Sequence, residues 1–126
     1  MNLMRIMVLG VLLSGGLAAG GMKDDRNVFI NTQLRAAYAS MGAARNSSDF
    51  TQYLVCQIVA TTSGISGTCE AQNTQGTLVA CQTTNQYLLE VLKSINDTSF
   101  VGFSWDVNGE CNQIYVGHGS PYGPKQ

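Results

Sequence analysis

The stretch GTCEAQNTQGTLVACQ, residues 67–82, decides the fold because its side chains alternate between two faces on either side of a turn. A three-residue loop, with Gly76 in the left-handed conformation, predicts a β-hairpin in which Cys69 lies opposite Cys81. In this register one face is uniformly apolar and consists of Cys69, Ala71, Val79 and Cys81. The stretch therefore predicts a hairpin with one apolar and one mixed face.

A second hairpin is predicted by SFVGFSWDVNGECNQIYVG, residues 99–117. Asp106 to Gly109 fit a four-residue turn, and Asn108-Gly109 alone also fits a shorter loop. With the longer loop, Trp105 faces Cys111 and shares a side with Val101, Phe103 and Tyr115. With the shorter loop, it faces Asn112 and joins Phe103, Ile114 and Val116. A tryptophan beside a disulfide favours the longer loop.

Three other segments place apolar residues at helical intervals. The first begins at Asp24 and ends or weakens at Gly42, and the second covers residues 49–61. The third follows a capping box formed by Thr83 and Gln86, although its residues also fit a continuing strand. The order of elements predicts an α+β fold with two or three helices packed on a small antiparallel sheet of two hairpins.

The four cysteines, Cys56, Cys69, Cys81 and Cys111, are spaced too widely for a zinc site, and His118 is the only histidine. If the chain is exported, as its N-terminal residues 1–20 indicate, the even number of cysteines predicts two disulfides. The hairpin register favours Cys69 with Cys81 and Cys56 with Cys111. The alternative joins Cys56 to Cys69 and Cys81 to Cys111.

Residues 1–20 have the composition of a signal peptide, with Arg5 before an apolar run and small residues at the cleavage site after Gly20. Cleavage leaves a small disulfide-stabilised domain over residues 21–117 and an irregular tail over 118–126 that contains both prolines. We therefore expect a secreted or periplasmic protein.

The apolar N-terminal segment, the helix after it and the disulfide-bonded β region at the C-terminus resemble the subunits of type IV pilus-like filaments. This resemblance implies a filament or membrane-anchored subunit that keeps its N-terminal apolar helix, the only case in which we expect a membrane partner. Those subunits carry an acidic residue near the processed start, whereas here no acidic residue precedes Asp24.

Charge and motif content narrow the chemistry. Removal of residues 1–20 leaves six Lys or Arg and eight Asp or Glu, because Arg5 is the one charged residue removed. No basic face remains for nucleic acid. Asp106, Asn108 and Glu110 resemble part of a calcium loop, but they lack its other ligands and turn formation explains them. We expect no metal and no cofactor.

Two readings of function compete with the filament. One is a small hydrolase that uses His118 with a carboxylate such as Glu110. The favoured one is a non-catalytic module, such as an inhibitor, accessory subunit or effector, that binds another protein or a cell-surface component. Its candidate contact patch is Trp105, Tyr115 and Tyr122, although Trp105 also fits the core.

Overall fold

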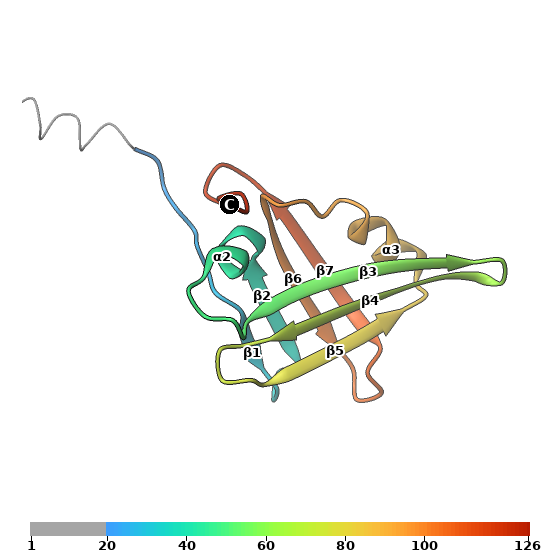
Figure 1. Ribbon diagram of the computed structural model, residues 1–126. Helices are drawn as coiled ribbons and strands as arrows, with labels where there is room; N and C mark the ends of the chain where they lie inside the picture. Colours follow the sequence, from blue (N-terminus) through green and yellow to red (C-terminus); the bar gives the residue numbers. More distant parts are fainter. Residues whose placement is uncertain (1–19) are drawn as a thin grey trace, which may run out of the picture.

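The computed structural model describes residues 20–126, which form two packed antiparallel sheets with two short helices (Figure 1). The predicted signal peptide lies outside the described residues except for Gly20. The elements are β1 (Phe29–Asn31), β2 (Ala36–Ser40), α2 (Met41–Asn46), β3 (Tyr53–Thr61), β4 (Gly64–Gln72), β5 (Leu78–Thr83), α3 (Gln86–Leu92), β6 (Ser99–Trp105) and β7 (Cys111–His118). Strands dominate, so the α+β prediction describes this chain only coarsely.

The strands divide into a four-stranded sheet, in the order β1-β2-β6-β7, and a three-stranded sheet, in the order β3-β4-β5. In Figure 1 the three-stranded sheet crosses in front of the four-stranded sheet, with α2 and α3 above its upper edge. The inner faces of both sheets and one side of α3 enclose the core. Its most deeply buried residues include Ala39, Val101, Cys69, Ala71 and Leu89.

The first predicted helix is wrong, because most of that segment forms β1, a turn and β2. Ala37 and Ala39 are buried against the core, while Tyr38 between them faces the other way. This period of two suits a strand, and pairing with β6 fixes it. Leu34, one of the apolar residues in the helical pattern, lies in the turn between β1 and β2, and its side chain is 76% exposed.

The second predicted helix, residues 49–61, is also wrong, because β3 occupies most of it. Asp49, the expected helix cap, accepts hydrogen bonds from the backbone N–H groups of Thr51 and Gln52 and so caps a turn before the strand. The run from Tyr53 is rich in aromatic and β-branched residues, which favour strands.

The third predicted helix is present as α3, but it begins later than the capping box implied. Asn85 is the N-cap, since its side chain accepts hydrogen bonds from the N–H groups of Tyr87 and Leu88. Thr83 Oγ1 instead accepts the N–H of Asn85. Gly67 on β4 lets the helix approach, because a Cβ there would lie 2.5 Å from Leu92 Cδ1.

The two hairpins that were predicted form at their predicted turns, as β4–β5 and β6–β7. In the first, Cys69 pairs with Cys81 and Gly76 has a φ of 85°. In the second, the longer loop is confirmed because Trp105 pairs with Cys111. A β-bulge between Ser104 and Trp105 then shifts the register, so that Tyr115 pairs with Gly102 and faces away from the core side of β6.

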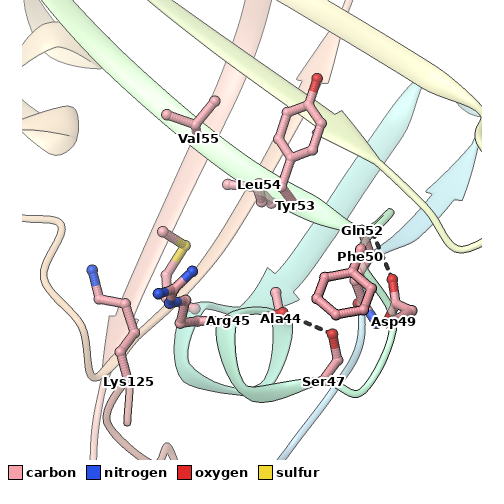
Figure 2. A pocket seen from close by; sticks show the side chains of 11 residues that line it. Ala44, Arg45, Ser47, Asp49, Phe50, Gln52, Tyr53, Leu54, Val55 and Lys125 are labelled. Carbon is pink, nitrogen blue, oxygen red and sulfur yellow. Dashed lines mark hydrogen bonds between the residues drawn. The ribbon is translucent and has the colours of Figure 1, made fainter.

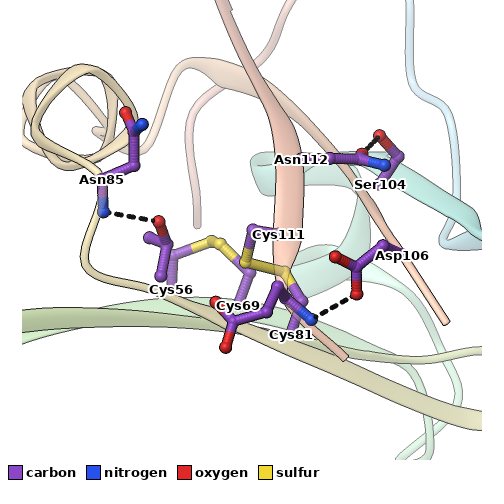
Figure 3. The surroundings of a disulfide bond; sticks show 10 residues. Cys56, Cys69, Cys81, Asn85, Ser104, Asp106, Cys111 and Asn112 are labelled. Atoms are coloured by element: carbon purple, nitrogen blue, oxygen red, sulfur yellow. Dashed lines mark hydrogen bonds between the residues drawn. A yellow bond between two sulfur atoms is a disulfide. The ribbon is translucent and has the colours of Figure 1, made fainter. Parts of the chain in front are cut away.

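The disulfides join Cys56 to Cys69 and Cys81 to Cys111, so the favoured pairing is wrong and the alternative is the observed one. Cys69 lies opposite Cys56 as well as Cys81. Counting from the two-residue turn between β3 and β4, Cys56 and Cys69 form a pair without backbone hydrogen bonds, which brings their Cα atoms to 4.1 Å. Figure 3 shows the two bonds next to one another.

The C-terminal tail has no helix or strand after His118, but it is tied to the rest of the chain. Asn46 at the end of α2 donates to the Pro124 carbonyl and accepts the N–H of Gln126. Pro121 accepts the N–H of Asp24 at 2.8 Å. Residues near both ends of the described chain therefore lie together beside α2.

Candidate binding surface

The outer face of the four-stranded sheet, which points away from the three-stranded sheet, carries a group of aromatic side chains that we call the aromatic face. The sheet register places Phe29, Tyr38, Gly102 and Tyr115 in one row across β1, β2, β6 and β7. Phe100 lies two residues before Gly102 and therefore on the same face. The aromatic face consists of Phe29, Tyr38, Phe100, Tyr115 and Tyr122.

Phe100 is the centre of this group. Its ring centroid lies 5.5 Å from that of Tyr38, 5.9 Å from that of Tyr115 and 5.7 Å from that of Tyr122. Phe29 stacks on the other side of Tyr38 at 5.0 Å. Phe100 is buried, whereas Phe29 and Tyr115 are 47% and 53% exposed. Such contacts fix the ring positions while leaving apolar surface open to a partner.

Arg26 covers one end of the aromatic face. Its guanidinium carbon lies 4.4 Å from the ring centroid of Phe100 and 5.4 Å from that of Tyr38. Asp24 holds the guanidinium through two hydrogen bonds of 2.7 and 2.8 Å. These contacts lower the pKa of Asp24 and raise that of Arg26, so the pair is charged across the ordinary pH range.

The backbone around Arg26 is fixed by Ser40, the last residue of β2. Ser40 N–H donates to the Arg26 carbonyl at 2.9 Å, and Ser40 Oγ donates to the Asp24 carbonyl at 2.8 Å. The segment before β1 thus runs along the end of the sheet in a fixed position.

The remaining part of the aromatic face contains a hollow of about 230 Å³, which we call the Gly102 slot. Tyr38 and Tyr115 stand on either side of Gly102 and Phe100 closes one end. A Cβ at Gly102 would meet Tyr38 Cβ at 3.4 Å, which is ordinary contact. Neither crowding nor a positive φ therefore requires glycine here, and the missing side chain opens the space between the two tyrosines.

The three residues of the sequence-based patch do not share one surface. Tyr115 and Tyr122 both contact Phe100 on the aromatic face. Trp105 packs against the core, opposite Cys111 and with its ring 5.8 Å from that of Phe103. Sequence reasoning missed Tyr38 because a helix was expected there, although the alternation around it indicates a strand.

Glu110 directly precedes β7, and His118 is its last residue, so the full length of the strand separates the two side chains. His118 Nδ1 lies 3.2 Å from the hydroxyl of buried Ser99. Asp106 Oδ1 accepts the N–H groups of Asn108 and Glu110, as expected for a turn. Within residues 20–126, no three His, Cys, Asp or Glu side chains are grouped closely enough to hold a metal ion.

A second hollow, of about 480 Å³, lies between α2 and the start of β3, and we call it the α2–β3 groove (Figure 2). Met41, Ala44 and Arg45 line it on α2, and Tyr53, Leu54 and Val55 line it on β3. Lys125 of the tail lies at its border. Tyr53 hydrogen-bonds Glu70 on β4, and this contact raises the pKa of Tyr53.

The helices of the described chain are too short and too polar to cross a membrane. Comparisons with protein-family models, curated proteins and solved structures found no match for this chain.

Proposed function

We propose that this protein is an exported, non-catalytic binding module that contacts a partner protein through the aromatic face. The observation that carries the proposal is the Gly102 slot, an open space between two fixed tyrosine rings on an otherwise regular sheet. Its walls are mainly apolar, and its size suits one aliphatic or proline side chain of a partner. Half-exposed Phe29 and Tyr115 would extend the contact on both sides.

Two disulfides indicate an oxidising extracellular or periplasmic environment. This environment supports the proposed export. The contacts of His118 support a structural role for that residue, because its ring lies within hydrogen-bond distance of the buried Ser99 hydroxyl and Glu110 lies at the far end of the strand. A binding role therefore needs fewer assumptions than hydrolysis.

Site-specific photo-crosslinking of the exported protein tests this proposal. A crosslinking residue at Gln113, which lines the slot, is expected to capture a defined partner. The same residue at Thr68, exposed on the three-stranded sheet, is the matched control and is expected to capture none. Gly102→Val, which fills the slot, is expected to abolish the Gln113 adduct. Equal adducts from both positions, or an adduct that survives Gly102→Val, would contradict the proposal.

Two further measurements separate the competing functions. Loss of biological activity in His118→Ala, with the adduct at Gln113 unchanged, would favour the hydrolase. Intact mass of the exported protein that includes residues 1–20 would favour the filament subunit.

A further inference from the structure

The free edge of β3 is the starting observation. Among the described residues, β3 pairs only with β4, and no other backbone hydrogen bond reaches it. Because hydrogen-bonded and non-hydrogen-bonded pairs alternate from the turn after Thr61, the N–H and C=O groups of every second residue point away from β4. These outward residues are Leu54, Cys56, Ile58 and Ala60.

The other sheet edges in residues 20–126 are short or covered. β1 is only three residues long, and α3 packs mainly against β7, with fewer contacts to β3. β5 is bound to the loop before β7 through the Gln82 N–H and the Gly109 carbonyl. In contrast, β3 is nine residues long and contains no proline and no charged residue. Proteins protect open edges with such residues because an open edge accepts another strand.

The α2–β3 groove lies beside the start of this edge and carries positive charge. Arg45 and Lys125 face the start of β3 (Figure 2), and neither forms a salt bridge in the described part of the chain. The one acid in the groove, Asp49, already binds the side chain and backbone of Gln52. The groove therefore offers two cations without an internal partner, next to unpaired backbone groups.

We infer that the α2–β3 groove binds an extended, acidic segment of a partner protein, which adds to β3 as a fourth strand of the three-stranded sheet. Backbone hydrogen bonds to the outward groups of β3 provide the affinity of such a contact, and the side chains in the groove provide its specificity. Seven extended residues, at about 3.3 Å each, match the distance from Leu54 to Ala60. Carboxylates on this segment would pair with Arg45 and Lys125.

A second copy of this chain fits the edge less well. Its own β3 carries no charged residue, so two β3 strands paired together would leave all the groove cations without acids. The inference concerns a site separate from the aromatic face, and its test does not depend on the slot.

The test uses the full exported protein and fluorescein-labelled heptapeptides, followed by fluorescence anisotropy. The probe is Val-Glu-Val-Thr-Val-Glu-Val, and the same peptide with Lys in place of Glu is its control. We expect the Glu peptide to bind at least about 10-fold more tightly at low salt. Arg45→Gln and Lys125→Gln are each expected to weaken it about three- to fivefold, and raised salt to weaken it further. Lys93→Gln, which removes a lysine paired with Glu90 on α3, is the matched control and should have no effect.

The backbone contribution is tested at Ile58, whose N–H points outward. Ile58→Pro removes that donor without removing a bond to β4 and is expected to abolish binding, whereas Ile58→Val keeps the donor and the affinity. If Ile58→Pro fails to fold, two N-methylated Glu peptides make the same test, one methylated on the odd-numbered residues and one on the even-numbered residues. Only the set whose N–H groups point toward β3 blocks pairing when it is methylated. No binding of the Glu peptide, equal binding of the Lys peptide, or identical affinity for both methylated peptides would overturn the inference. Concentration-dependent dimers that Ile58→Pro abolishes would overturn it in favour of a second copy.

Discussion

Cys81 on β5 and Cys111 on β7 form a disulfide that links the three-stranded sheet to the four-stranded sheet, with their Cα atoms 5.0 Å apart. The other disulfide, Cys56–Cys69, joins neighbouring strands that already share a ladder of hydrogen bonds. The two bonds therefore restrain different parts of the fold, one between the sheets and one within a sheet.

Removal of the inter-sheet bond is predicted to cost more stability. The double replacement Cys81→Ala with Cys111→Ala opens a loop of 30 residues, and Cys56→Ala with Cys69→Ala opens one of 13. Chain entropy alone gives losses of roughly 3.5 and 3 kcal/mol, and the first change also releases the packing of the sheets. Urea unfolding of both variants measures the difference. A smaller loss for the inter-sheet pair would contradict this account of the core.

Gly67→Ala is predicted to destabilise the protein by about 1–3 kcal/mol. The added methyl group would lie 2.5 Å from Leu92 Cδ1 and 3.0 Å from Leu89 Cδ2, so these buried leucine side chains must shift and α3 packs less closely on β4. Loss of helix packing should lower both the urea midpoint and the protection of α3 amides against hydrogen exchange. Unchanged protection of α3 would show that the helix does not depend on this approach.

Gly102→Ala is the opposite case and is predicted to raise stability by about 0.5–1 kcal/mol. Its strand conformation suits alanine, and the nearest atom to the new methyl group is at 3.4 Å. The same methyl group occupies the floor of the slot, so partner capture through Gln113 should fall while the thermal midpoint rises. A variant that is more stable and binds equally well would show that the slot is not used.

Turn chemistry made the β4–β5 and β6–β7 hairpins predictable, whereas the β1–β2 and β3–β4 hairpins fall wholly or partly in segments that were predicted as helices. The left-handed Gly76 fixed the first hairpin, and Asp106 with Gly109 fixed the second, because these conformations depend only on neighbouring residues. Helical spacing misled elsewhere, since a few apolar residues in a short segment fit either period. The segment around Tyr38 forms a strand because it pairs with β6, which lies more than 60 residues later in the sequence. Local spacing of apolar residues cannot reveal such a distant partner.

The candidate site was partly hidden for the same reason. Tyr115 was placed on the side of Phe103, but the bulge at Ser104 turns it to the opposite face, where it meets Phe100. No residue type in that stretch signals the bulge. Cys56 faces Cys69 in a pair without backbone hydrogen bonds, and this close pair forms the disulfide. That pair can be identified only when β3 is known to be a strand, and the sequence predicted a helix there.

The hydrogen bonds of Asp49 predict acid sensitivity. Its carboxylate accepts the side-chain amide of Gln52 at 2.8 Å and the backbone N–H groups of Gln52 and Thr51, and these contacts lower its pKa from the usual 3.8. Gln52 in turn accepts the N–H of Val28, which anchors the segment before β1. A carboxyl whose pKa is lower in the folded state stabilises the fold above the unfolded pKa, and this contribution is lost as the pH falls toward the folded value.

Asp49→Asn therefore should lower the urea midpoint at pH 6, and the gap between variant and wild type should narrow steadily below about pH 4. The matched control is Asp97→Asn, because Asp97 is exposed and its carboxylate accepts no hydrogen bond among the described residues, so its replacement should leave the urea midpoint at pH 6 unchanged. A gap that stays constant from pH 6 to pH 3 would mean that the Asp49 charge does not stabilise the turn, and that the strand start is held by Gln52 and Val28 alone.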